Sequence, residues 1–228
     1  MRFNRTIKVI ALINVVSGFS RYPLWILLAL YFATVRHLSD LDIALIFLVT
    51  EVATAPFSIF GGRFSDRAGR RPLLLGTIMG TFGGYTLLFL SVTFGWSIVI
   101  VIIALILVNL LNSLETVGVN AVVTDVSTED QRLDFFGLQR VAGNAGIGVG
   151  LVLAGLSYEF WPGLFCIAPV LGAAVELLLF WQWIPESLKS TPQPAAPIPR
   201  GHSLRAFRDT RLVTIALMLP LAALIANQ

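Results

Sequence analysis

The stretch Gly62-Arg63-Phe64-Ser65-Asp66-Arg67-Ala68-Gly69-Arg70-Arg71-Pro72 is the most informative part of this sequence. It holds a glycine, an acid-base pair, a second glycine and two adjacent arginines. Apolar segments flank it on both sides, over about 41–61 and 73–92. Each is about 20 residues long, which is the length that a helix needs to cross roughly 30 Å of hydrocarbon. The sequence therefore predicts a short charged connection between two membrane-spanning helices.

The composition of the whole chain agrees with a membrane location. Of its 228 residues 56% are hydrophobic and only 13% are charged, which is unusual for a soluble domain of this length. Seven segments are long and apolar enough to cross a bilayer, over about 10–32, 41–61, 73–92, 96–124, 136–156, 163–184 and 212–226. We therefore expect an all-α, multi-pass integral membrane protein. Cys166 is the only cysteine, so it cannot form an internal disulfide and is expected to serve in packing.

Positive charges mark one side of the predicted spans. With the N-terminus in the cytoplasm, all of the 16 Lys and Arg residues except Arg21 and Arg36 fall in or beside cytoplasmic segments. Because cytoplasmic loops carry an excess of Lys and Arg, this distribution predicts a cytoplasmic N-terminus, in the plasma (inner) membrane. The basic character of the chain follows from this topology, and no nucleic-acid partner is expected.

The charged stretch resembles the motif that joins the second and third helices in the major facilitator superfamily of secondary transporters. Phe64 stands where leucine is usual, and Ala68 stands where an aromatic residue is usual. The resemblance implies a six-helix N-terminal bundle over residues 1–185 and a cytoplasmic linker over 186–210, whose proline-rich middle cannot hold a regular helix. Residues 211–228 would be the first helix of an incomplete second bundle. We therefore expect a truncated transporter, whose partner is the missing C-terminal bundle or a second copy of itself.

Several residues of the charged stretch are candidates for gating. A carboxylate beside a helix end can cap the positive N-terminus of a neighbouring helix, and Asp66 is the candidate for this role. Arg70 would pair with Asp66 and with Asp125, at the inner end of the fourth span, to form a charge cluster that closes the cytoplasmic side. The alternative is that these charges only anchor the hairpin to lipid headgroups. The candidate set is Gly62, Asp66, Arg67, Gly69, Arg70, Arg71 and Asp125.

Glycines recur along the fifth predicted span in a pattern that resembles a motif of antiporters in this superfamily. They are Gly137, Gly146, Gly150 and Gly155. The family pattern has a proline after the third glycine, and Leu151 stands in that place here. Small residues spaced four apart let helices approach closely in lipid, where van der Waals contact drives packing. The pattern favours antiport, with symport and uniport as the alternatives.

Polar residues inside the predicted spans are candidates for a transport site. A charge at the bilayer centre costs around 2.5–3.5 kcal/mol on insertion scales, so such residues usually face a cavity or a partner. Two stripes repeat at helical spacing, namely Asn14, Ser17, Arg21 and Trp25 on the first span and Asn109, Asn112, Glu115 and Thr116 on the fourth. Because the family lines its central cavity with these two helices, the resemblance implies that the stripes form one wall of the substrate path.

Acidic residues at similar depth suggest how a proton could be coupled to transport. Glu51, halfway along the second span, or Glu115 would carry the coupling proton, with burial and the nearby Arg21 setting when the carboxyl is protonated. Alternatively, Arg21 and Glu51 form an ion pair that only fastens two helices. Glu176 on the sixth span is expected to be structural, because the family places that helix at the periphery. The expected substrate contacts are Asn109, Asn112 and Trp25.

These features predict a secondary active transporter, resembling drug/proton antiporters, that exchanges protons for small organic compounds by alternating access. The alternatives are a transport-incompetent half-transporter that acts as a membrane scaffold or partner, and a sugar-porter-like uniporter or symporter. An enzyme is not expected, because the sequence shows no metal-ligand cluster, no phosphate-binding glycine loop and no nucleophile-base arrangement. No cofactor or metal site is expected. The expected partners are membrane lipids, a small-molecule substrate and protons.

Overall fold

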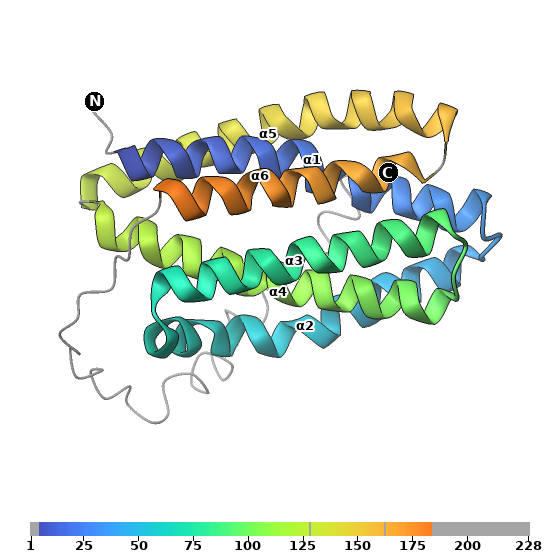
Figure 1. Ribbon diagram of the computed structural model, residues 1–228, viewed down its shortest axis with the longest axis horizontal. Helices are drawn as coiled ribbons and strands as arrows, with labels where there is room; N and C mark the ends of the chain where they lie inside the picture. The colour runs from blue at the N-terminus through green and yellow to red at the C-terminus, as the bar shows by residue number, and fades with distance from the viewer. Residues whose placement is uncertain (1–4, 128, 162, 184–228) are drawn as a thin grey trace, which may run out of the picture. The chain divides into compact units, whose positions relative to one another are not determined.

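The computed structural model describes residues 5–127, 129–161 and 163–183, and for residues 55–68 and 129–133 it describes the backbone alone. All secondary structure in these residues is helical (Figure 1). The elements are α1 (Arg5–Thr34), α2 (Asp40–Ala68), α3 (Arg70–Thr93), α4 (Ile98–Val126), α5 (Glu129–Phe160), the short 3-10 helix η1 (Leu164–Cys166) and α6 (Ile167–Trp183).

Five of these helices, α1, α3, α4, α5 and α6, contain segments long and apolar enough to cross a membrane. Every long helix also exposes large apolar side chains, such as Ile26, Leu48, Met79, Ile103, Val152 and Leu178. Lipid would cover such side chains, in agreement with a multi-pass membrane protein. The first six predicted spans each coincide with one long helix. The predicted seventh span, the linker and the domain boundaries fall outside the described residues, and the count of six plus one helices stays a prediction.

The charged stretch is not a loop, which corrects the expectation from the sequence. α2 continues to Ala68 and α3 begins at Arg70, so Gly69 alone joins them. Gly69 has φ 90° and ψ 150°, a conformation that glycine adopts readily and other residues avoid. Hydropathy locates only the apolar part of a helix, and here both helices continue through charged turns. The other candidates of this stretch therefore lie on helices, with Gly62, Asp66 and Arg67 at the end of α2 and Arg70 and Arg71 at the start of α3.

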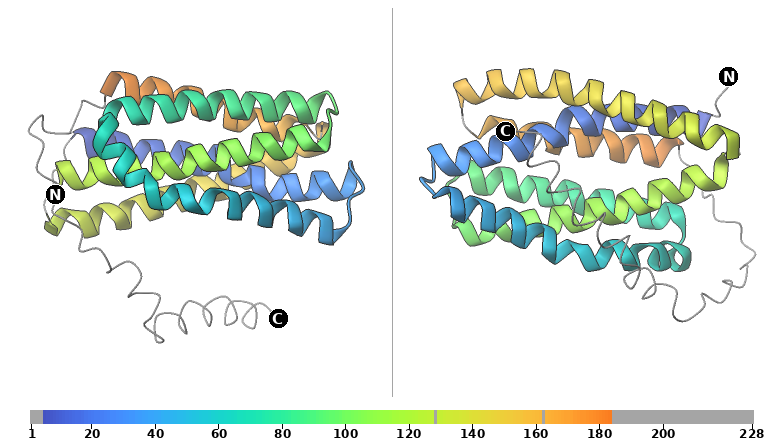
Figure 2. Two further views of the ribbon diagram at one scale, coloured as in Figure 1. Left: turned by 90° about the horizontal axis from the view of Figure 1, so that it is seen from below. Right: turned by 180° about the vertical axis from the view of Figure 1, so that it is seen from behind.

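The six long helices pack in a definite order of neighbours. α1 packs between α5 and α6, α3 packs between α4 and α6, and α2 packs on α4 (Figures 1 and 2). α1 and α4 meet at only a few positions. The space between these two helices is therefore not filled by close helix packing, and it is there that the polar stripes of both helices lie.

The apolar core is divided into two clusters along the helices. One cluster includes Leu24, Leu28, Leu88, Leu105 and Phe165. The other includes Ile7, Ile10, Leu74, Val123 and Phe180. On α1, α3, α4 and α6 the residues between the two clusters include buried polar ones, namely Arg21, Thr81, Glu115 and Glu176. A polar layer thus crosses the bundle between the two apolar clusters.

Candidate functional site

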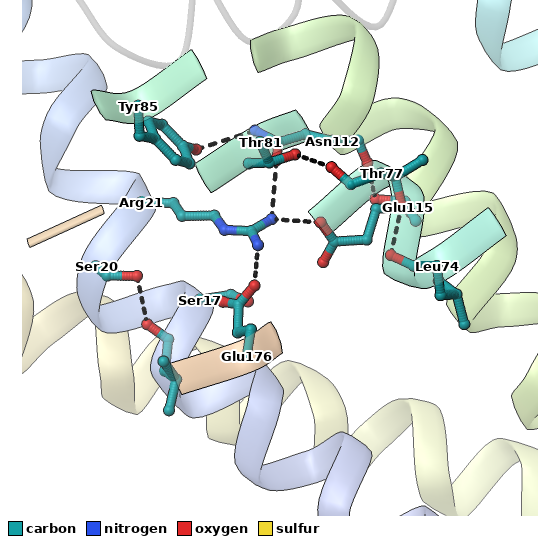
Figure 3. A network of polar contacts seen from close by, with 12 residues as sticks. Ser17, Ser20, Arg21, Leu74, Thr77, Thr81, Tyr85, Asn112, Glu115 and Glu176 are labelled. Carbon is teal, nitrogen blue, oxygen red and sulfur yellow. Dashed lines mark hydrogen bonds and ion pairs between the residues drawn. The ribbon is translucent and has the colours of Figure 1, made fainter. Parts of the chain in front are cut away.

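Arg21 of α1 stands at the centre of this polar layer (Figure 3). Its Nη1 donates to Oδ1 of Asn112 at 2.8 Å and to Oε2 of Glu115 at 3.1 Å, and its Nη2 donates to Oε2 of Glu176. The exposed fraction is 8% for Arg21, 5% for Glu115 and 0% for Glu176. In the part of the chain that the structure describes, these are the charged residues that are buried. We call Arg21, Asn112, Glu115 and Glu176 the Arg21 cluster.

Glu176 belongs to this cluster, contrary to the expectation of a peripheral α6. Its Oε1 accepts a hydrogen bond from Oγ of Ser17 at 2.7 Å, so both of its carboxylate oxygens accept bonds from α1. α6 packs against α1 and α3, and its inner face therefore meets the polar stripe of α1 directly. A glutamate in the middle of an otherwise apolar span was the sequence signal for this role.

Tyr85 of α3 contacts both Asn112 and Arg21 of the cluster, which the sequence did not predict. Its hydroxyl accepts a hydrogen bond from Nδ2 of Asn112 at 3.0 Å, and its ring centroid lies 6.0 Å from the guanidinium carbon of Arg21. The side-chain oxygen of Asn112 thus accepts from Arg21, and its side-chain nitrogen donates to Tyr85. A tyrosine within an apolar span usually finds a partner for its hydroxyl, and its place in the third predicted span was the available signal.

Glu51 lies apart from the Arg21 cluster. It is exposed, and its Oε1 accepts a hydrogen bond from Nδ2 of Asn109 at 3.0 Å. The ion pair between Arg21 and Glu51, which the sequence left open as an alternative, is not formed, since Arg21 binds Glu115 and Glu176 instead. α2 packs on α4 and meets α1 at few positions. Similar depth along the two helices is therefore not enough to bring Glu51 to Arg21.

A groove of about 720 Å³ lies beside the Arg21 cluster, between α1, α4 and α5. The stripes predicted on the first and fourth spans line it together, with Asn14, Ser17, Arg21, Trp25, Asn109, Asn112, Glu115 and Thr116. Glu51 and Glu176 are not among the lining residues. The groove therefore offers amides, aromatic rings, two guanidinium groups and the carboxyl group of Glu115, which is also bonded to Arg21.

The wall that α5 contributes was missed by the sequence analysis. It consists of Phe136, Gln139, Arg140, Gly143, Asn144 and Ile147. Nε2 of Gln139 donates to Oδ1 of Asn14 at 3.0 Å, which joins this wall to α1. The lining positions 136, 139–140, 143–144 and 147 recur every three to four residues, so helical spacing was again the signal.

Where α3 begins and α4 ends, the structure brings together two of the gating candidates. Nε of Arg70 donates to Oδ2 of Asp125 at 3.2 Å. Nη2 of Arg71 donates to the backbone carbonyl of Trp181 at 3.0 Å, near the end of α6. The side chains of Asp66 and Arg67 lie outside the described residues, so the capping role of Asp66 and its pairing with Arg70 stay predictions.

Gly146 and Gly150 of α5 lie directly against the backbone of α1. A Cβ at Gly146 would come within 2.9 Å of the Phe19 nitrogen, and one at Gly150 within 3.0 Å of the Phe19 Cα. A Cβ at Gly18 would likewise overlap the backbone of Gly143. Any larger side chain at these positions would push the two helices apart.

Gly137 and Gly155 do not share this contact. A Cβ at either position meets no described atom within 4 Å, so the described residues show no close contact for them and their packing role stays a prediction. Each is nine residues from Gly146, about two and a half turns, which puts it on the opposite side of α5. The close contact is instead made by Gly143, Gly146 and Gly150.

Pro23 explains why Gly150 is needed at its position. Because proline has no N–H, the carbonyl of Phe19 lacks the donor that a regular helix would supply from position 23. A Cβ at Gly150 would overlap this same carbonyl oxygen. The missing side chain of the glycine therefore leaves this oxygen the room that a Cβ would take. This contact lies close to Arg21 along α1.

Two comparisons with known proteins bear on this architecture. A family model described as Major Facilitator Superfamily matches residues 10–227. A tetracycline resistance protein, class D, of Salmonella ordonez is 33% identical over 141 residues. The match covers 61% of this chain and 34% of that protein, so the chain spans about a third of its length.

Proposed function

The chain belongs to the major facilitator superfamily of membrane transporters, and from this premise we propose that the protein is a proton-coupled exporter of small organic compounds. The groove between α1, α4 and α5 would be the substrate site. One groove is lined both by uncharged hydrogen-bonding and aromatic side chains and by Glu115, and this observation carries the proposal. A proton and a substrate bound side by side can each change the affinity for the other, which is what exchange requires.

The residues proposed to contact the substrate are Asn109, Asn112 and Trp25, with Asn14 and the α5 side chains Gln139 and Asn144 adjoining them. Amides offer donors and acceptors together, and Trp25 offers a flat apolar surface. This combination suits an aromatic molecule with several polar substituents. The relative described above is named for resistance to tetracycline, which makes tetracycline the first compound to test.

The candidate proton sites are Glu115 and Glu51, as the sequence suggested. Glu115 is buried and bonded to Arg21, whereas Glu51 is exposed and bonded to Asn109. A carboxyl that is buried in one conformation and reached by water in another changes its affinity for protons between the two. Such a change would couple protonation to alternating access.

The ion pair of Arg70 with Asp125 is proposed to belong to the cytoplasmic gate, together with Asp66. By analogy with the family, the groove would be closed by a second six-helix bundle, and the gate would open as the two bundles rock. The single-residue connection at Gly69 keeps the start of α3 close to the end of α2, so charges on both can act on one neighbouring helix.

The proposal is tested by flux measurements in inside-out membrane vesicles. An acidic lumen should drive accumulation of tetracycline, or of another aromatic compound in a panel, and a protonophore should abolish it. Vesicles without the protein and vesicles with Glu159→Gln, a change at an exposed residue away from the groove, are the controls. Absence of gradient-dependent flux for all compounds, both with the chain alone and with a second bundle supplied, would contradict the proposal and favour a scaffold role.

A further inference from the structure

We infer that the three buried charges of the Arg21 cluster divide into a fixed ion pair, Arg21 with Glu176, and one exchangeable proton site, Glu115. Glu176 is then a positioning residue, whose charge leaves Glu115 free to gain and lose a proton. The inference rests on the proposed function, because it names the proton site of that transporter. It also assigns a role to a residue of α6 that does not line the groove.

The charges of the cluster do not balance when all three groups are ionised. Arg21 contributes one positive charge, and Glu115 and Glu176 contribute two negative ones. An uncompensated charge in a low-dielectric interior costs several kcal/mol after relaxation. Arg21 is the one buried cation among the residues that the structure describes. The cluster is therefore neutral only when one of its two carboxyl groups holds a proton.

The hydrogen bonds indicate which carboxyl remains ionised. Both oxygens of Glu176 accept bonds, from Ser17 and from Arg21, and the side chain is completely buried away from the groove. Two accepted bonds stabilise the charged form of a carboxyl. Glu176 is thus the permanent counter-charge of Arg21.

Glu115 is held more loosely and has access to the groove. Its Oε2 accepts one bond from Arg21 at 3.1 Å, and in the described part of the chain no hydrogen bond is seen at its Oε1. It lines the groove, whereas Glu176 does not. A proton on Glu115 could be donated to water or to a polar substrate there, and the Arg21 to Glu176 pair would stay intact.

The other ionisable groups around Glu115 do not change this assignment. On α3, Tyr85 is bonded to Asn112 and places its ring near the guanidinium of Arg21, and among the described residues it shows no hydrogen bond to Glu115. On α2, Glu51 is bonded to Asn109, which is six residues or about 9 Å along α4 from Glu115. On α5, Arg140 lines the groove but is exposed, so water already screens its charge.

Loss of the proton would also change how the helices are held together. With Glu115 ionised, Arg21 is shared between α4 and α6. With Glu115 protonated, the guanidinium keeps Glu176 and Asn112 but loses its charged partner on α4. Of the two bonds that join Arg21 to α4, the protonated state would then keep only the uncharged one to Asn112, between helices that otherwise meet at few positions.

Dicyclohexylcarbodiimide tests the inference without any transport measurement. It adds to protonated carboxyl groups in apolar surroundings and leaves a stable N-acylurea, which peptide mass spectrometry locates. In the full chain we expect the label at Glu115, increasing as the pH is lowered, and none at Glu176. Glu176→Gln makes Glu115 the only counter-charge of Arg21, so labelling of Glu115 at a given pH should fall about tenfold or more, as one pH unit of displacement would give.

Two further variants keep the test decisive. Ser17→Ala removes one hydrogen-bond donor to Glu176. It should also lower the labelling of Glu115, by less than Glu176→Gln does. It provides the test if Glu176→Gln folds poorly. Glu159→Gln should leave labelling of Glu115 unchanged. Label found on Glu176, or labelling of Glu115 that is equal in Glu176→Gln and the unmodified protein, would overturn the inference. Correct labelling without any substrate flux would instead contradict the proposed transport function alone.

Discussion

Arg21 and Glu176 are bonded to each other although they lie 155 positions apart in the chain. The bond joins α1 to α6, and the bonds of Arg21 to Asn112 and Glu115 join α1 to α4 at the same level. Three helices are therefore fixed to one guanidinium group, between two apolar clusters. Any account of stability or activity in this bundle has to begin with that group.

Arg21→Gln should destabilise the bundle strongly. It leaves two buried carboxyl groups without a cation, and removal of one partner of a buried ion pair costs about 3–5 kcal/mol. We expect a decrease of this order in the free energy of unfolding, measured with denaturant in detergent. Arg140→Gln removes an exposed arginine of the same groove and should change this free energy little.

The double variant Arg21→Gln with Glu176→Gln should lose less stability than the sum of the two single changes, because it removes both partners of the fixed pair. A double-mutant cycle measures this coupling. Additive effects of the two changes would show that the bond between these residues contributes nothing to stability.

The contact of α5 with α1 predicts opposite results for two glycine substitutions on the same helix. Gly150→Ala forces a Cβ into the Phe19 carbonyl and should cost about 1–3 kcal/mol, as overpacking does. Gly155→Ala meets no described atom and should be neutral or stabilising by up to about 1 kcal/mol through helix propensity. Thermal unfolding of the two variants in detergent gives the comparison. Equal effects would contradict the packing described.

The ion pair of Arg70 with Asp125 should matter more for transport than for stability. Its side chains are 12% and 29% exposed, so a contribution of about 0.2–1 kcal/mol is expected. Asp125→Asn should therefore unfold almost normally but transport more slowly. The exchanged pair, Arg70→Asp with Asp125→Arg, should regain part of the transport rate. A double variant slower than either single one would exclude an electrostatic role for the pair.

The predicted topology can be tested by cysteine labelling in a Cys166→Ser background. A membrane-impermeant maleimide applied from outside intact cells should not label Ala68→Cys, which lies just before the single-residue connection to α3. The same reagent should label Phe94→Cys, an exposed position at the opposite end of α3. The reverse pattern would place the N-terminus outside and invert the proposed direction of transport.

Much of this architecture follows from local sequence. Apolar length predicts the six helices, and helical spacing predicts that Asn14 and Arg21 on α1 share a face with each other, as Asn112 and Glu115 do on α4. These are properties of single helices, so a pattern in one segment is enough to find them. The structure confirms that both faces line one groove.

The partners of each face were not predictable in the same way. Arg21 could have met Glu51, Glu115 or Glu176 by depth alone, and only the order of helix packing selects the last two. The glycines of α5 show a similar limit, because the family spacing included Gly137 and Gly155 on the side away from α1. Which face of a helix meets which neighbouring helix depends on long-range packing, and a pattern within one segment does not specify that packing.

The most direct test of coupling at the Arg21 cluster is a comparison of two transport modes in Glu115→Gln. Gradient-driven accumulation of the identified substrate requires the exchangeable proton, whereas exchange of external for internal substrate without a pH gradient does not. We predict that Glu115→Gln loses gradient-driven accumulation and keeps substrate exchange, with Glu159→Gln unchanged in both. Accumulation that persists in Glu115→Gln and still collapses with a protonophore would contradict the account.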